Sequence, residues 1–403
     1  MRILQVTSSL NANTGGVAQA IKTLAHEFKQ LSVHNEIVVV ADGQIDAVNN
    51  ASSATHYLGP VNNAWGYNAR LIPWLKINLP RFDAVIVNGL WLHHSYAAWK
   101  VVKTLKAKKQ KGKVPKLLIM PHGMLDPYFQ HAPDRKLKAI RNVLYWRLIE
   151  NKVINEADAL LFTTETELLL ARQPFKPYHP QKQYNVGLGI AAPPLQCDDM
   201  STAFNKCCPD LDGQPYLLFL GRIDIKKGVD LLINAYIDLH KRSVATDKKI
   251  FKLVIAGPGS DSGFCLTLKK QLQEEPGVGR DVHFTGMLTG NAKWGAFYEC
   301  EAFILPSHQE NFGISVVEAL ACSKPVLISN QVNIWPEVND GGLVADNTME
   351  GTAQLLKNWM LLNDDEKKKM GAAARNAYLQ HFQSLPVAKK ITSLVYDLLN
   401  VSN

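Results

Sequence analysis

HQENFGISVVEAL (308–320) places two carboxylates around the start of a predicted helix, directly after the short apolar strand AFILP (302–306). Seven residues separate Glu310, on the loop, from Glu318, one turn inside the helix that follows Gly313. A helix N-terminus carries unpaired N–H groups and partial positive charge, so it attracts an anion such as a diphosphate. The glycine lets backbone come close to a ligand. Carboxylates on either side of such an anion can bind sugar and ribose hydroxyls, so the stretch suits a nucleotide sugar.

A pair of cations follows another apolar strand, YLLFLG (216–221). In GRIDIKKG (221–228), Arg222 and Lys227 come directly after this strand, and Gly228 permits the turn into the next helix. Guanidinium binds phosphate through two parallel hydrogen bonds, whereas ammonium acts as a compact point charge. An Arg/Lys pair after a strand is more often ordinary surface. Together with the paired carboxylates, however, it indicates a diphosphate site.

Two more strand ends lie in the same half of the chain. IAGPG (255–259) has a glycine loop, which predicts that Gly257 lines the rim of the nucleotide site, although a lone glycine loop is a weak signal. HFTGML (283–288) offers its backbone to a base edge, with Met287 or Leu288 against the ring. An ordinary strand-to-loop turn is an equally good interpretation of this second segment.

The first half of the chain offers fewer polar candidates. Gly15-Gly16 follows the first strand and opens a helix, but it is not a GxGxxG fingerprint, so dinucleotide binding is disfavoured. His122 follows the strand KLLIMP (116–121), and we expect it to act on the sugar, with a structural hydrogen bond as the alternative. Asp126, four residues on, is the candidate for contact with an acceptor.

Strand-like and helix-like segments alternate through both halves of the 403-residue chain. Short apolar runs separated by helical stretches indicate βα units and parallel sheets. The pattern therefore predicts an α/β fold of two Rossmann-like domains facing across a cleft, because ligands bind outside the carboxyl ends of such strands. The predicted strands span 2–6, 36–41, 83–89, 116–121, 157–164, 184–190, 216–221, 252–257, 281–286, 302–306 and 325–329.

The segment 191–215 interrupts this alternation, because it is rich in proline and cysteine and has no clear periodicity. We interpret it as a linker between an N-terminal domain (1–190) and a C-terminal domain (216–385). The first domain carries a net charge of +11 and the rest of the chain −3. Much of this excess lies in the lysine run 100–116. The simplest interpretation of that run is a helix end and loop exposed to solvent. The functional alternative is attraction to an anionic membrane leaflet.

Composition excludes several classes of protein. No apolar stretch approaches the roughly 18 residues that span a bilayer, and the apolar run at the start is too short for a signal peptide. The six cysteines form no CxxC pair, so we expect free thiols in a reducing compartment. Nucleic acid is disfavoured because the lysine run lacks interleaved aromatics, and no metal-ligating motif stands out. We expect a cytoplasmic protein, with peripheral association with the inner face of the cell membrane.

The helix predicted over 135–153 has cations beside Leu144, Tyr145 and Trp146. A surface that faces a membrane or an acceptor is one interpretation. Packing of these three apolar residues into the core is the alternative.

GRIDIKKG, IAGPG and ENFGISVVEAL together resemble the retaining family-4 glycosyltransferases of GT-B fold. PHGMLDPY and the Gly15-Gly16 loop look like members of that family that build bacterial exopolysaccharide. The resemblance runs over about 1–400 and is strongest in 216–330. It implies two Rossmann-like domains, acceptor-side first and donor-side second, and a C-terminal helix, assigned to 386–403, that crosses back onto the first.

The resemblance also implies roles for individual residues. Arg222 and Lys227 would bind the donor diphosphate and stabilise its charge. Glu310 would contact the sugar at its 3-hydroxyl, Glu318 would hold the ribose hydroxyls, and His122 would bond the sugar 6-hydroxyl. Asn311 stands where such proteins vary, so it is a candidate for sugar preference. The donor-side positions implied besides these are Gly16, Gly257, Leu288, Phe312, Gly313 and Ile314.

The activity implied is that of a metal-independent hexosyltransferase without cofactor. The donor would be a UDP-hexose such as UDP-glucose, favoured over GDP-mannose, and the acceptor a glycan or a polyprenyl-linked oligosaccharide in exopolysaccharide synthesis. A nucleotide-sugar epimerase of the same two-domain form is the alternative, followed by a non-enzymatic sugar-nucleotide sensor and a phosphorylase. Glu310 as a covalent nucleophile is the less favoured mechanism.

Overall fold

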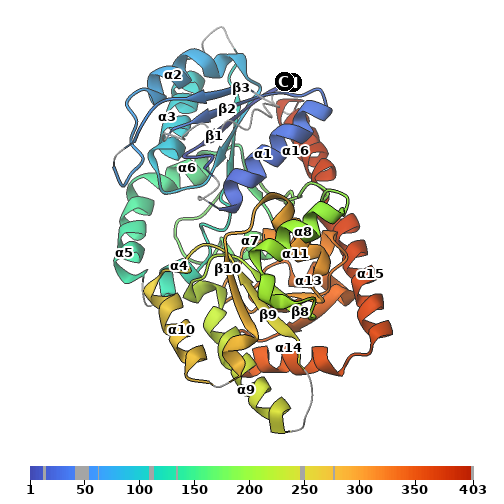
Figure 1. The fold of residues 1–403 in the computed structure, drawn as a ribbon. Coiled ribbons are helices and arrows are strands. Elements are labelled where there is room, and N and C mark those ends of the chain that lie inside the picture. The colour runs from blue at the N-terminus through green and yellow to red at the C-terminus, as the bar shows by residue number, and fades with distance from the viewer. Residues whose placement is uncertain are drawn as a thin grey trace. The chain divides into compact units, whose positions relative to one another are not determined.

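A computed structural model of the protein describes residues 1–11, 15–40, 54–61, 63–108, 113–132, 135–245, 250–275 and 277–400 (Figure 1). The chain forms two compact units. Met1–Ala191 and the chain from Gln383 onward make up the first unit, and Ala192–Phe382 make up the second.

The first unit is built on a seven-stranded sheet in the order β3-β2-β1-β4-β5-β6-β7. All of its strand pairs are parallel. The strands are β1 (Arg2–Thr7), β2 (His34–Val39), β3 (Ala54–Tyr57), β4 (Ala84–Asn88), β5 (Lys116–Met120), β6 (Ala159–Phe162) and β7 (Gln183–Asn185). The α-helices are α1 (Gly16–Gln30), α2 (Leu71–Asn78), α3 (His93–Ala107), α4 (Tyr128–His131), α5 (Lys136–Tyr145), α6 (Asn151–Glu156), α7 (Glu165–Leu170) and α16 (Ser384–Asn400).

The second unit is built on a six-stranded sheet in the order β10-β9-β8-β11-β12-β13, again with every pair parallel. The strands are β8 (Tyr216–Leu220), β9 (Lys252–Ala256), β10 (Val282–Gly286), β11 (Ala302–Leu305), β12 (Val326–Ser329) and β13 (Gly342–Ala345). The α-helices are α8 (Asp198–Cys207), α9 (Val229–Ala245), α10 (Gly263–Gln273), α11 (Gly290–Glu299), α12 (Ile314–Ala321), α13 (Trp335–Val338), α14 (Met349–Leu361) and α15 (Asp364–His381).

The central strands explain why the apolar runs are continuous rather than alternating. Every residue of β4, β6, β11 and β12 is buried, as expected for parallel strands that are covered by helices on both faces. In each sheet the first strand, β1 or β8, has the next two strands of the chain on one side and all later strands on the other. Ligands bind outside the carboxyl ends of strands at such a switch point. The predicted pair of Rossmann-like α/β domains is confirmed.

Several elements differ from the sequence prediction at the edges of the sheets. The edge strands β3 and β13 were not predicted. The strand predicted over 184–190 covers only Gln183–Asn185, because Gly187 has a φ of 80° and ends the pairing. Residue 41, the last of the predicted strand 36–41, lies outside the described residues.

The ends of the second unit also differ in detail from the expected boundaries. Residues 191–215, assigned above to a linker, include helix α8, which packs against α11. The last helix, α16, packs against α1 of the first unit, where Figure 1 shows it in red beside the blue α1. A Cβ on Gly189 would lie 2.3 Å from Cα of Ser384, so a glycine is needed where this helix begins.

Candidate functional site

Four loops of the second unit converge at the carboxyl ends of β8, β9, β10 and β11. Backbone hydrogen bonds join the first three, since N–H of Gly221 donates to Ala256 (3.0 Å) and N–H of Gly257 donates to Gly286 (2.7 Å). A Cβ on Gly257 would lie 1.8 Å from the carbonyl oxygen of Gly221, so no larger residue fits there. Close packing against Gly221 is therefore enough to require glycine at position 257, the predicted rim of the nucleotide site.

The fourth loop, after β11, is fastened to the 221–228 loop. N–H of His308 and the hydroxyl of Ser307 both donate to the carbonyl oxygen of Lys226, each at 2.8 Å. Gly228, with a φ of 67°, passes so close to Pro306 that a Cβ would lie 2.0 Å from its carbonyl oxygen. These contacts fix the position of Lys227 relative to Glu310.

Lys227 and Glu310 form an ion pair across these two loops. Both side chains are largely buried, with 17% and 16% of their surface exposed. Burial lowers the pKa of Lys227 to about 7, the charge of Lys226 acts in the same direction, and Asp224 opposes them. An adjacent carboxylate such as Glu310 favours the charged ammonium on general electrostatic grounds. Ammonium has three N–H donors, so this lysine can hold Glu310 and still donate to a phosphate oxygen.

Glu310 leads directly into helix α12. Two backbone hydrogen bonds fix Glu310, each 2.9 Å long. Its N–H donates to the carbonyl oxygen of Gln331, and its own carbonyl oxygen accepts from N–H of Asn333. Gly313 is the N-cap residue of α12, with a φ of 78°, and no side chain caps the helix there. The helix therefore presents backbone N–H groups and partial positive charge beside the Lys227–Glu310 pair.

Glu318 lies one turn inside α12 and is 8% exposed. Its Oε1 is 2.5 Å from Nζ of Lys293, a residue of α11 that the sequence analysis did not identify. The Lys293 ammonium also lies over the rings of Trp294 (4.8 Å) and Phe297 (5.9 Å). Burial raises the pKa of Glu318, and Lys293 opposes this shift. The two carboxylates of the 308–320 stretch are thus each paired with a lysine.

The structure places the other predicted donor-side residues of the second unit at the same sheet edge, with different accessibility. Arg222 is exposed, and its Nε lies 3.6 Å from Asp224. The side chain of Phe312 is buried against Phe382, so only its backbone can face a ligand. Leu288 is buried, whereas the neighbouring Met287 is 53% exposed. Asn311 and Ile314 flank the capping glycine at the start of α12.

The predicted residues of the first unit lie at the carboxyl ends of its own strands. His122, after β5, has a φ of 53° and its Nε2 lies 3.0 Å from Oδ1 of Asn88, at the end of β4. Burial lowers the pKa of His122 to about 4, so the ring is neutral near pH 7. Glu167, which the sequence analysis did not identify, accepts a hydrogen bond from N–H of Gly123 (2.6 Å) and so holds this loop.

The predicted acceptor residue has a visible structural role. Asp126 is 7% exposed, and its Oδ1 accepts a hydrogen bond from N–H of Tyr128 at 2.8 Å, where α4 begins. Gly16 is the first residue of α1, after Gly15 with a φ of 88°. Contact of either residue with a ligand stays a prediction.

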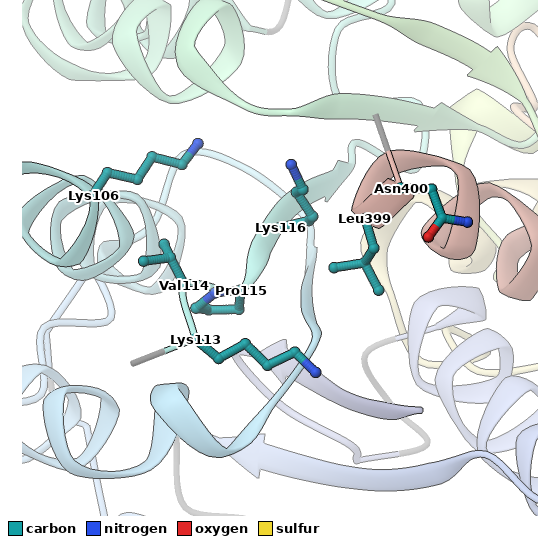
Figure 2. Close-up of a pocket in the computed structure, with 7 residues that line it drawn as sticks. All are labelled: Lys106, Lys113, Val114, Pro115, Lys116, Leu399 and Asn400. Atoms are coloured by element: carbon teal, nitrogen blue, oxygen red, sulfur yellow. The ribbon is translucent and has the colours of Figure 1, made fainter. Parts of the chain in front are cut away.

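A pocket of about 420 Å³ lies at the opposite, amino end of β5 (Figure 2). It is lined by Lys106, Lys113, Val114, Pro115, Lys116, Leu399 and Asn400. Lys106 and Lys113 form ion pairs with Asp158 and Asp83. Within the described ranges, no group of three His, Cys, Asp or Glu side chains could hold a metal ion, and all six cysteines are free. No helix in the described part of the chain is long and apolar enough to cross a membrane.

Sequence comparison finds a similarity to a known family within the second unit. Residues 209–377 match the family model described as Glycosyl transferases group 1. The D-inositol 3-phosphate glycosyltransferase of Gordonia bronchialis is 26% identical over 235 residues, which are 56% of this chain and 49% of that protein. An uncharacterized glycosyltransferase of Methanocaldococcus jannaschii is 34% identical over 119 residues, which are 30% of this chain and 28% of that protein. The chain therefore spans half or less of the length of these relatives.

Solved structures show the same fold over nearly the whole chain. HepE of Anabaena, in complex with UDP and glucose, has a TM-score of 0.73 at 15% identity and covers 98% of this chain and 100% of its own. Sucrose-phosphate synthase of Thermosynechococcus elongatus has a TM-score of 0.70 at 16% identity and covers 100% of both chains. The chain has the GT-B fold of these glycosyltransferases, and residues 209–377, within its second unit, are similar to the family described as Glycosyl transferases group 1.

Proposed function

We propose that this protein is a retaining glycosyltransferase that moves a hexose from a nucleoside-diphosphate sugar to a glycan or a lipid-linked oligosaccharide, in the synthesis of an exopolysaccharide or related envelope polysaccharide. The observation that carries the proposal is the contact of Lys227 with Glu310 at the uncapped N-terminus of α12, one turn before Glu318. A UDP-hexose is the favoured donor, and the UDP and glucose bound in the structural neighbour HepE support this choice.

The chemistry requires a nucleoside diphosphate to leave an anomeric carbon. As the bond from the sugar C1 to the phosphate oxygen breaks, the electron pair goes to the leaving phosphate. In this proposal Arg222, Lys227 and the N–H groups of α12 donate to that phosphate, because donors held in place before the reaction stabilise the charge that develops on it. The acceptor hydroxyl attacks C1 from the same face, and its proton passes to the departing phosphate oxygen.

The carboxylates then bind the two sugars of the donor. Glu310, fixed by its backbone and by Lys227, accepts hydrogen bonds from the transferred hexose. Glu318 accepts hydrogen bonds from the ribose diol. His122 is neutral near pH 7, so it can serve the sugar 6-hydroxyl as a hydrogen-bond partner without adding a charge. No step requires a metal ion or a cofactor.

The test is a donor screen followed by product analysis. We expect one of UDP-glucose, UDP-galactose, UDP-N-acetylglucosamine and GDP-mannose to raise the melting temperature of the protein, because a ligand that binds only the folded state stabilises it. With an acceptor extract, mass spectrometry should then show a hexose added to a glycan and NMR should show a retained anomeric configuration. Absence of binding to every donor would refute the proposal.

The same experiment separates the alternative enzyme. A nucleotide-sugar epimerase would isomerise the donor when no acceptor is present, whereas a transferase would leave it unchanged or hydrolyse it slowly. Incubation with donor alone, followed by chromatography of the nucleotide sugar, decides between them.

A further inference from the structure

The helical run from α5 through the π-helical turn Trp146–Glu150 carries exposed apolar side chains that do not pack into the core. Four of them recur at the spacing i, i+3, i+7 and i+11, which places neighbours on one face of a helix. We call them the α5 stripe. They are Leu137 (84% exposed), Ile140 (60%), Leu144 (57%) and Leu148 (70%).

The opposite face of this run is firmly anchored in the first unit. Trp146 is 1% exposed, stacks on Phe175 with ring centroids 4.9 Å apart and donates its indole N–H to the carbonyl oxygen of Lys176 at 3.1 Å. Tyr145 stacks on Trp65 at 5.2 Å. Tyr145 and Trp146 therefore pack inward, as one of the two interpretations predicted, whereas Leu144 points outward. The α5 stripe is not a misplaced part of the core.

The charges around the α5 stripe are of one sign. Lys136, Lys138 and Arg147 on this run are exposed, and so is Lys152 in α6, which continues it. Its only acidic side chain between Lys136 and Lys152 is Glu150, which is fully buried. A basic helix with a row of exposed leucine and isoleucine side chains is typical of segments that lie in a membrane interface.

Trp65 adds a side chain that suits the same environment. It is 44% exposed beside Tyr145, and the guanidinium of Arg141 lies 5.7 Å from the centre of its ring. Tryptophan is enriched where hydrocarbon meets water, because its ring is apolar and its N–H is polar.

The lysine run 100–116, the first candidate for a membrane contact, is less suited to it. Lys103, Lys106 and Lys113 form ion pairs with Glu156, Asp158 and Asp83. Three of the eight lysines of that run are therefore compensated within the first unit. At the α5 stripe, exposed cations and exposed apolar side chains occur together.

We propose that the α5 stripe and its flanking cations dock the first unit on an anionic lipid bilayer, with the four apolar side chains in the headgroup and acyl boundary and the cations against lipid phosphates. Charge complementarity and the row of exposed apolar side chains select this partner over a polyanion, which would need no apolar row. The proposal stands independently of the transferase activity, because it involves no residue of the donor site.

The test is sedimentation of the full-length protein with phospholipid vesicles. We expect binding to vesicles of phosphatidylglycerol and phosphatidylcholine, weak binding to phosphatidylcholine alone, and weaker binding at high salt. The stripe variant Leu137→Gln/Ile140→Gln/Leu144→Gln/Leu148→Gln should lower the partition coefficient at least about tenfold. The charge variant Lys136→Gln/Lys138→Gln/Arg147→Gln/Lys152→Gln should lower it similarly on anionic vesicles only.

Matched controls change the same kinds of residue elsewhere. For the stripe we choose the exposed residues Ile77 (75%), Leu195 (91%), Leu266 (54%) and Leu361 (70%), each replaced by Gln. For the cations we choose the exposed residues Lys22, Lys357, Lys368 and Lys389, also replaced by Gln. Both controls should bind vesicles like the wild type, and melting temperatures establish that all variants fold.

Two outcomes would overturn the proposal. One is a wild-type protein that does not sediment with anionic vesicles, or a stripe variant that binds them as well as the wild type does. The other is a wild-type dimer in analytical ultracentrifugation that the stripe variant converts to a monomer, without any effect of lipid. That result would make the stripe an interface between two copies of the chain. Neither outcome affects the proposed transfer reaction, because no donor or acceptor is present.

Discussion

The ammonium of Lys293 lies 2.5 Å from Oε1 of Glu318, in a position where both side chains are mostly shielded from water. The two residues come from α11 and α12, the helices that precede and follow β11. The cation therefore opposes the effect of burial, which raises the pKa of the carboxylate that we expect to hold the ribose. Without it, burial would favour the neutral acid, which accepts hydrogen bonds from a diol less well.

The Lys293→Met variant should raise the KM for the donor at least about tenfold at neutral pH, because Glu318 loses the cation that opposes its protonation. Burial already raises the pKa of Glu318, and removal of Lys293 raises it further. Donor affinity should therefore recover as the pH is increased. Donor titration calorimetry over a series of pH values measures this effect.

The matched control is Lys367→Met, which removes an ion pair with Glu301 in the same unit. Its donor affinity should equal that of the wild type at each pH. A Lys293→Met variant with unchanged affinity and unchanged pH dependence would show that Glu318 does not depend on this lysine.

Lys227→Ala should lower turnover at least about a hundredfold, because it removes a fixed donor from the leaving phosphate. Circular dichroism and thermal unfolding establish that the variant keeps its fold. The control is Lys241→Ala, which removes a surface lysine paired with Glu275 at 2.7 Å. Near-normal turnover of Lys227→Ala would exclude the lysine from the mechanism.

The Lys227–Glu310 pair also predicts a pH dependence. Phosphate binding requires the ammonium form, so kcat/KM for the donor should fall as the pH rises through the pKa of Lys227, which burial lowers towards 7. Glu310→Gln removes the carboxylate that favours the ammonium, so the fall should move to lower pH by about one unit. The control Glu350→Gln changes an exposed carboxylate and should leave the profile in place. A profile that moves to higher pH in Glu310→Gln would contradict this coupling.

The loops after β8 and β11 were predictable because their signals are local. In GRIDIKKG and ENFGIS, the strand end, the glycine and the charged residue lie within one short segment, and glycine is required wherever the chain turns with positive φ. Gly228 and Gly313 both have such a φ in the structure. The central strands were predictable for a similar reason, since burial on both faces produces an unbroken apolar run.

The partners of these residues were not predictable, because they depend on contacts between distant segments. Lys293 and Glu318 are 25 residues apart and come together only because α11 and α12 flank the same strand. In sequence, Lys293 is one polar residue of GNAKWGAFYE, with no feature that marks it. The edge strands β3 and β13 were missed for another reason. All of their residues are half-buried or exposed, so these strands lack the apolar run that identifies a central strand.

Gly228→Ala should destabilise the second unit by about 1–3 kcal/mol. The new methyl group would meet the carbonyl of Pro306, and the residue would have to keep a positive φ. Urea unfolding measures the free energy. The control is Gly263→Ala at the start of α10, where a Cβ meets nothing within 4 Å. That change should alter the unfolding free energy by no more than about 0.5 kcal/mol. Equal stabilities of the two variants would mean that the 221–228 loop is not held against Pro306.

His122 offers a test of donor recognition by comparison of two donors. UDP-xylose lacks the hydroxymethyl group of UDP-glucose, so it cannot make the hydrogen bond that we propose between the sugar 6-hydroxyl and His122. If UDP-glucose is a donor, His122→Ala should lower kcat/KM for it about tenfold or more and leave the lower value for UDP-xylose nearly unchanged, since a lost hydrogen bond costs about 1–2 kcal/mol. The control Asn185→Ala changes a polar residue of β7, further along the same sheet. An equal loss for both donors would instead assign His122 to the support of its loop, through Asn88, rather than to the sugar.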